Sequence, residues 1–208
     1  GNIFDTDNVV LPRKIMDKRD LGKEPIPGDN PTGTDVSYND DYGALVDEIK
    51  KLSSPTSDSA IDWARVNSLC QKILGEESKN ILVACFLSVA LLKVDGLRGC
   101  ADGIHILKEL LECYWDSLYP PLKRKKGRIN ALNWWNDQLG KLIQNVANET
   151  WSAAERQEVL DDIAFIDDFI GEHLPDGPVL RSLIESLSSC ILEKQVVEAE
   201  TPVSVEAG

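Results

Sequence analysis

His105 and Cys113 are the two side chains of this sequence whose types could support nucleophilic or general-base chemistry. They lie eight residues apart in an apolar stretch, a spacing that could place both on one side of a helix. A cysteine–histidine pair also needs close contact, a surrounding cleft and donors for an oxyanion. The sequence indicates neither such donors nor a third residue, so the favoured interpretation is a packed or half-exposed histidine.

Paired carboxylates are the other candidates for acid–base chemistry. Glu158 and Asp162 could share one face of a helix, and adjacent pairs occur at Asp40-Asp41, Glu76-Glu77, Asp161-Asp162 and Asp167-Asp168. Acidic residues on an amphipathic helix are usually solvated, because burying a charge is costly. We therefore predict a solvated acidic surface and no catalytic residues. The alternative is an all-helical enzyme or small-ligand binder that uses carboxylates with His105 or Cys113.

A basic and aromatic stretch follows Cys113, "YWDSLYPPLKRKKGRINALNWWNDQL". An exposed loop between helices is the favoured interpretation of its charge run, docking on an acidic protein surface is the second, and nucleic-acid binding is the third. Helical spacing directs Trp135 inward, so Trp134 is the tryptophan expected at the surface. The candidate partner-binding residues are Lys123, Arg124, Lys125, Lys126 and Trp134.

Recognised cofactor and metal motifs are missing from the sequence. There is no GxxxxGK[ST], HExxH or GxSxG, and "GLRGCADG" at 96–103 follows a helical pattern, so its glycines are expected to shape a helix–helix connection. His105 and His173 are the only histidines, and the five cysteines form no CxxC pair. We predict no metal, no cofactor, and free thiols in a reducing compartment.

Composition narrows the class of protein. The chain has 208 residues, 42% of them hydrophobic, which allows a substantial core. Its net charge of −13 disfavours nucleic acid as a partner, because phosphate contacts need basic residues. The most apolar run, residues 81–92, is shorter than the ~20 residues that span a bilayer. These features predict a soluble cytoplasmic protein without direct membrane insertion.

Hydrophobic periodicity predicts an all-α fold, an irregular bundle of about seven helices around one core. Residues 1–37 are rich in proline and glycine and are expected to form an extended lead-in, and residues 193–208 an acidic flexible tail or the start of a linker. The helical domain would then occupy residues 38–192, with its centre in the almost wholly apolar helix at 79–95. The predicted helices cover 39–52, 62–74, 79–95, 100–118, 129–146, 152–170 and 178–191.

An ordered series of motifs over residues 25–143 resembles the ImpA N-terminal family, the TssA-type subunits of the bacterial type VI secretion system. An N-terminal segment, "PIPGDNPTGTDVSYNDDY", is similar to the family's Pro/Gly segment. It precedes "SKNILVACFLSVALLKVDGLRGCADGIHILKELLECYWDSLYPP", and "RINALNWWNDQL" then opens the next helix. The matching residues are Asp35, Tyr38, Asn39, Ser78, Lys79, Asn80, Gly96, Leu97, Gly99, Tyr114, Trp115, Asp116, Pro120, Arg128, Ala131 and Leu132.

The resemblance implies a non-enzymatic assembly role in the bacterial cytoplasm. Its partners would be other secretion subunits, of the baseplate, the sheath or tube, or the membrane complex. Homo-oligomeric rings would require a C-terminal region beyond this chain. Tyr114, Trp115 and Trp135 are expected to anchor helices against the core, and Asp116 to cap a helix or pair with Arg128. The basic run departs from the acidic or mixed segment common in the family.

Overall fold

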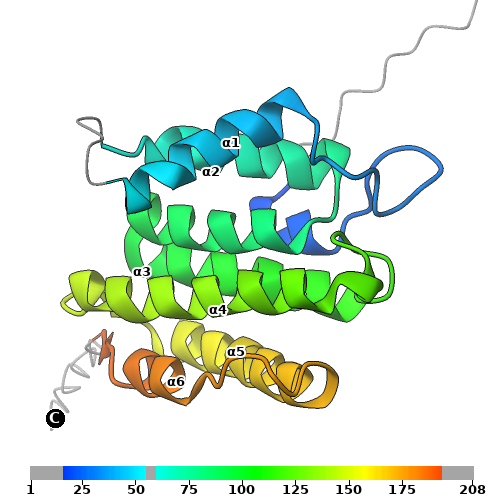
Figure 1. The fold of residues 1–208 in the computed structure, drawn as a ribbon. Coiled ribbons are helices and arrows are strands. Elements are labelled where there is room, and N and C mark those ends of the chain that lie inside the picture. Colours follow the sequence, from blue (N-terminus) through cyan, green and yellow to red (C-terminus); the bar gives the residue numbers. More distant parts are fainter. Residues whose placement is uncertain (1–15, 55–59, 194–208) are drawn as a thin grey trace, which may run out of the picture.

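Six α-helices carry the fold in the part of the chain that the computed structural model describes, residues 16–54 and 60–193 (Figure 1). They are α1 (Asp40–Lys50), α2 (Trp63–Lys72), α3 (Ile81–Tyr114), α4 (Lys125–Leu142), α5 (Ala153–His173) and α6 (Arg181–Ser188). Short turns are η1 (Lys18–Gly22), η2 (Lys51–Ser53), the π-helical η3 (Ile73–Glu77), η4 (Leu122–Arg124) and η5 (Ile143–Val146). The predicted all-α fold is confirmed. No helix of the described ranges combines the length and apolar character needed to cross a membrane.

The helix count is six because two predicted helices, 79–95 and 100–118, belong to the single element α3, which doubles back at Gly96. This glycine has φ 67° and ψ −141°, a backbone conformation outside the helical region. In a straight helix residues 88 and 103 would lie about 22 Å apart. A Cβ atom built on Gly103 would instead lie 2.5 Å from the Cα of Ser88. The glycine-rich sequence thus connects two antiparallel helical arms, which is the predicted role of its glycines.

The first arm of α3 is the centre of the core, as its apolar character predicts. Helix α2 packs on α3 from one side, and α4 and α5 pack on it from the other, with α6 against α4 and α5 (Figure 1). The indole Nε1 of Trp135 in α4 donates a hydrogen bond to the hydroxyl of Ser88, at 2.9 Å, inside this contact. The side chains of the first arm therefore contact neighbouring elements on all sides. The hydroxyl of Ser88, a buried polar group of this arm, has its partner in Trp135.

A parallel pair of two-residue strands within the described residues was not predicted from the sequence. β1 (Thr150–Trp151) lies beside β2 (Ile191–Leu192) and joins the start of α5 to the end of α6. Two residues are too few for an alternating pattern to show in the sequence. Ser152 then caps α5 by accepting a hydrogen bond from the Glu155 amide at 3.1 Å.

The described part of the predicted lead-in, residues 16–37, packs on α3. Leu21, Ile26 and Val36 are buried. A Cβ atom on Gly22 would lie 2.2 Å from the carbonyl oxygen of Ile106, so η1 sits directly on the second arm of α3. Isolated side chains make these contacts, and for that reason the segment shows no periodic pattern. Residues 1–15 and the predicted tail beyond residue 193 lie outside the described residues.

Candidate functional site

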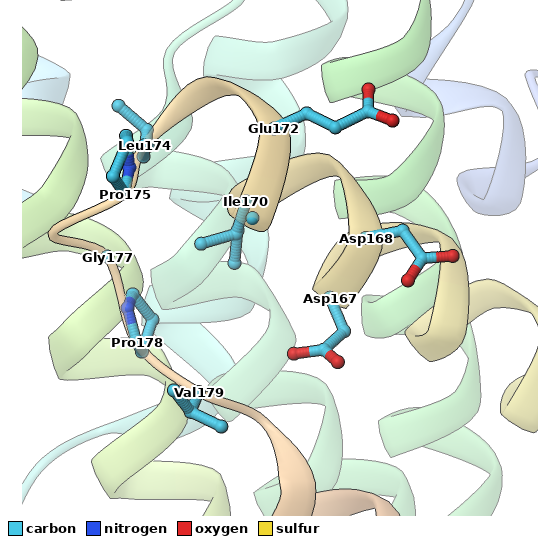
Figure 2. Close-up of a pocket in the computed structure, with 10 residues that line it drawn as sticks. Asp167, Asp168, Ile170, Glu172, Leu174, Pro175, Gly177, Pro178 and Val179 are labelled. Carbon is cyan, nitrogen blue, oxygen red and sulfur yellow. The ribbon is translucent and has the colours of Figure 1, made fainter.

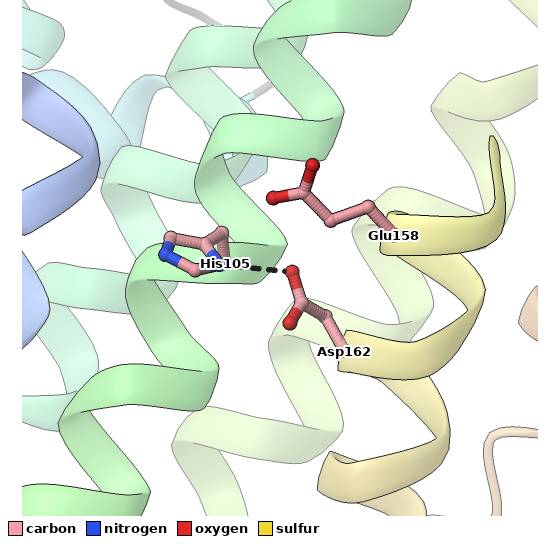
Figure 3. Close-up of side chains that lie close together, drawn as sticks. All are labelled: His105, Glu158 and Asp162. Atoms are coloured by element: carbon pink, nitrogen blue, oxygen red, sulfur yellow. Dashed lines mark hydrogen bonds and ion pairs between the residues drawn. The ribbon is translucent and has the colours of Figure 1, made fainter. Parts of the chain in front are cut away.

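His105 lies at the contact between α3 and α5, where the carboxylate of Asp162 faces its ring (Figure 3). Its Nδ1 atom is 3.0 Å from Oδ2 of Asp162, and its Nε2 atom is 3.2 Å from Oε1 of Glu109. Glu158 lies one turn before Asp162 on α5, so these two acidic residues share a face as their spacing predicted. The tertiary structure thus assembles a histidine–carboxylate cluster from residues far apart in the sequence.

Two basic residues of η1, Lys18 and Arg19, pair with Glu158 of this cluster and with the nearby Asp102 of α3. The Arg19 guanidinium pairs with Glu158 and with Asp102, the latter at 2.6 Å. Lys18 pairs with Asp102 at 3.3 Å. Ligand atoms of His105, Glu158 and Asp162 lie within 4.8 Å of one another, close enough for a metal ion, but Arg19 supplies the positive charge at Glu158. The arrangement acts as an ion-pair network that ties η1 to α3 and α5.

Cys113 is not activated as a nucleophile. It lies at the surface, and partial desolvation of its sulfur together with the nearby charges of Glu109 and Glu112 raises the pKa of the thiol. A reactive cysteine needs the opposite shift, toward the thiolate. Within the described residues no hydrogen bond joins His105 to Cys113. All five cysteines are free thiols.

The hollow at the turn between α5 and α6 has a volume of about 460 Å³ and an apolar floor that includes Leu174 and Pro178 (Figure 2). Asp167 on its edge accepts a hydrogen bond from the Leu180 amide at 3.1 Å. Asp168 and Glu172 extend away from the apolar side chains. Its lining includes no histidine, thiol or basic group, so these carboxylates have no acid–base partner there.

The basic segment, defined as Lys123, Arg124, Lys125 and Lys126, is exposed along its whole length. The prediction of a loop is wrong in part, because η4 holds the first two residues and α4 begins at Lys125 rather than near Ile129. Within the described residues none of the four forms an ion pair, and the first turn of α4 contains no acidic residue. These charges surround the positive end of the helix dipole, where cations are unfavourable.

Trp134, the tryptophan expected at the surface, is half-buried. Its ring packs edge-to-face on Phe86, with centroids 5.0 Å apart and planes at 88°. Trp135 is fully buried, as its helical position predicted. One face of the candidate partner-binding tryptophan is therefore already engaged with α3.

Arg128 is fully buried at the junction of α3 and α4. It donates hydrogen bonds to the carbonyl oxygens of Trp115, Leu118 and Pro120, at 2.6, 2.9 and 2.9 Å. Its guanidinium carbon lies 4.4 Å from the Trp115 ring centroid. Burial lowers the pKa of Arg128 to about 10. The expected pairing with Asp116 is not among the ion pairs of the described residues, and Asp116 is exposed. Arg128 instead satisfies backbone carbonyls where α3 ends.

The remaining aromatic residues of the family motif link separate elements. Tyr114 donates its hydroxyl to the carbonyl of Lys23 at 2.5 Å. Trp115 meets Phe169 of α5 edge-to-face, with centroids 5.1 Å apart. Leu132 is fully buried in α4. The motif thus joins the lead-in, α3, α4 and α5 at one end of the bundle.

Lys79 is the second buried cation of the family motif. Its Nζ atom donates to the carbonyl oxygens of Leu21, at 2.6 Å, and Leu74, at 2.8 Å. The ring of Tyr114 lies 5.8 Å from this atom. Ser78 beside it is also fully buried, and Asn80 caps α3 by accepting from the Leu82 and Val83 amides. Lys79 therefore holds η1 and η3 together at the start of α3.

Raising the pH is expected to stabilise the wild-type chain relative to the variant Lys79→Met. Burial lowers the pKa of Lys79 from 10.5 to about 8. Above that pH the unfolded chain binds a proton that the folded chain has lost, so folding gains up to about 1.4 kcal/mol per pH unit until about pH 10. Urea unfolding of both proteins from about pH 7 to about pH 10 measures the difference.

The comparison with a variant is needed because burial raises the pKa of the thiols of Cys85 and Cys100, which destabilises both proteins equally above pH 9. A pH-independent difference between wild type and Lys79→Met would contradict the prediction.

The fold and these contacts define an all-helical domain. Its buried cations and its ion-paired carboxylates hold separate elements together, and its basic segment remains exposed. Residues 23–137 match the family described as ImpA, N-terminal, type VI secretion system, and the chain belongs to this family. The match spans most of the motif series on which the resemblance depends.

Two known proteins are similar to the chain. Over 119 residues it is 32% identical to the type VI secretion system component TssA1 of Pseudomonas aeruginosa, covering 50% of this chain and 33% of the relative. The chain thus spans about a third of that relative's length. A solved structure, the N-terminal domain including the conserved ImpA_N region of TssA from Burkholderia cenocepacia, has a TM-score of 0.68 and 16% identity. The likeness covers 87% of this chain and 94% of that one and confirms the fold.

Proposed function

We propose that this chain is a non-enzymatic interaction domain of a TssA-type subunit. It docks on other type VI secretion subunits, of the baseplate, the sheath or tube, or the membrane complex, in the bacterial cytoplasm. Membership of the ImpA N-terminal family and the likeness to TssA1 support the secretion role. Docking by surface contact is the further step that an experiment must test.

One observation carries this proposal: three distinctive residues of the family motif, Lys79, Gly99 and Arg128, are occupied in packing. Lys79 and Arg128 donate their hydrogen bonds to backbone carbonyl oxygens. Gly99 is in close contact with the backbone, because a Cβ atom added there would lie 2.0 Å from the carbonyl oxygen of Leu91. His105 and Glu158, the groups that the enzymatic alternative would use, are held by Asp162, Glu109 and Arg19. What remains free for recognition is the exposed surface, including the basic segment.

The purified chain is expected to bind at least one other type VI secretion subunit of the same bacterium. Each baseplate, sheath, tube and membrane-complex subunit, immobilised in turn on a biosensor, provides the measurement, with an unrelated acidic protein of similar size as the control. Surface docking of a single domain usually gives dissociation constants in or below the micromolar range, about 10⁻⁶ M. If none of these subunits binds the chain, the proposal is contradicted.

A further inference from the structure

Tyr38 is an aromatic side chain presented to solvent on a fixed backbone. It is 99% exposed, more than any other large hydrophobic side chain of the described residues. The turn that carries it is held on both sides, since Ser37 donates its amide and hydroxyl to Asp35 and the Asn39 amide donates to the carbonyl of Val36. Val36 is itself buried. Binding through this tyrosine would therefore order one side chain and little backbone.

The basic segment lies beside this turn. The hydroxyl of Tyr119, shortly before the segment, donates to the carbonyl of Gly33 at 3.3 Å. Hydrogen bonds from Ser37 lower the pKa of Asp35, and the positive charge of Arg124 lowers it further. Figure 1 shows the loop before α1 and the loop after α3 at the same end of the bundle. The exposed tyrosine and the four cations thus share one end surface.

The four cations of the basic segment form no ion pair among the described residues, although the charge of Arg124 acts on the nearby Asp35. The last two members of the segment open α4, whose N-terminus adds further positive potential. Four adjacent cations at such a position repel one another, and an acidic group of a partner would relieve this repulsion. The whole chain has a net charge of −13, so the remainder of the molecule is strongly acidic.

We propose that Tyr38 and the basic segment form a single docking surface, the Tyr38 surface, for an acidic patch of another type VI secretion subunit that also has an apolar recess for the tyrosine ring. This inference rests on the proposed function and names the chemistry of its partner. A protein fits better than DNA or an anionic bilayer, because an extended polyanion is repelled by the acidic remainder of the chain. A centrally packed tyrosine flanked by complementary charges is a common arrangement at interfaces.

The test compares surface variants for binding to the subunit that the wild-type chain binds. Tyr38→Ala is expected to raise the dissociation constant about tenfold or more, whereas Tyr38→Phe keeps the ring and most of the affinity. The double variant Lys123→Glu, Lys126→Glu is expected to slow association about tenfold and to abolish its dependence on salt. The matched controls are Val179→Ser, an exposed apolar residue elsewhere, and Lys50→Glu, Lys141→Glu, with the same change in charge. Both controls should bind within about twofold of wild type.

The outcomes separate this inference from the function on which it rests. If a subunit binds the wild-type chain and the Tyr38 and lysine variants equally well, the Tyr38 surface is wrong and the proposed function stands. If no subunit binds the wild-type chain, both are overturned. Lysine-dependent binding to DNA, to anionic vesicles or to a second copy of the chain, with subunit binding unchanged, also overturns the inference. Thermal unfolding of each variant confirms that the fold is intact.

Discussion

Replacing Gly103 by alanine is expected to lower the free energy of unfolding by about 3 kcal/mol. The added Cβ atom would lie 2.5 Å from the Cα and 2.7 Å from the hydroxyl oxygen of Ser88. Backbone atoms cannot rotate away, so the two arms of α3 must separate. Ser88 also accepts the hydrogen bond of the buried Trp135, so the separation disturbs the contact between α3 and α4 as well.

Urea denaturation of the wild-type chain and the variant measures this loss. Gly140→Ala is the matched control, because Gly140 lies in helix α4 and a Cβ atom added there would meet nothing within 4 Å. Alanine favours helix over glycine by about 1 kcal/mol, so this control should be stabilised or unchanged. Equal behaviour of the two alanine variants would show that the arms of α3 are not in close contact at Gly103.

Removing the Arg128 side chain is expected to have a comparable effect, a loss of about 3–5 kcal/mol for Arg128→Ala. The three carbonyl oxygens of Trp115, Leu118 and Pro120 would lose their donor where α3 ends. The Trp115 ring would also lose the guanidinium packed against it. Because buried acceptors without donors are costly, the segment between α3 and α4 should loosen before the rest of the domain.

Two further variants distinguish the hydrogen bonds from the volume of the arginine. Arg128→Met keeps much of the apolar stem but donates no hydrogen bond, and it should lose nearly as much stability as Arg128→Ala. Lys126→Ala, on the exposed side of the same helix, should change the free energy by less than about 0.5 kcal/mol. Hydrogen exchange of residues 115–124 reports local loosening. A stable Arg128→Met variant with unchanged exchange would contradict the assigned role.

The helices could be predicted because their signals are local. Apolar residues at three- and four-residue spacing define one face of each helix, and Ser152 starts α5 as its capping spacing indicated. The glycines at 96–103 predict a connection, and they turn α3 back on itself. Helix boundaries are harder to predict. The start of α4 within the basic segment was missed, because four consecutive charged residues show no apolar periodicity.

The candidate site depended on contacts that no local pattern records. His105 and Asp162 are 57 residues apart. The sequence therefore gave no reason to pair the histidine with this carboxylate rather than with Cys113, which is only eight residues away. Arg19, Glu109 and Asp102, which complete the ion-pair network, gave no signal in the sequence beyond being charged. Tyr38 was visible only as a motif residue, and its exposure became evident once the turn around it was placed.

The sequence by itself determined the helical class, the family and the central apolar helix, because these depend on the order and spacing of residue types. The tertiary structure decided which charges are buried. Arg128 follows the basic segment, whose charge predicts exposure, and Lys79 lies just before the apolar first arm of α3, yet both cations are fully buried. A cation can leave water only where several acceptors replace its hydration, and here those acceptors are backbone carbonyls that the folded chain brings together.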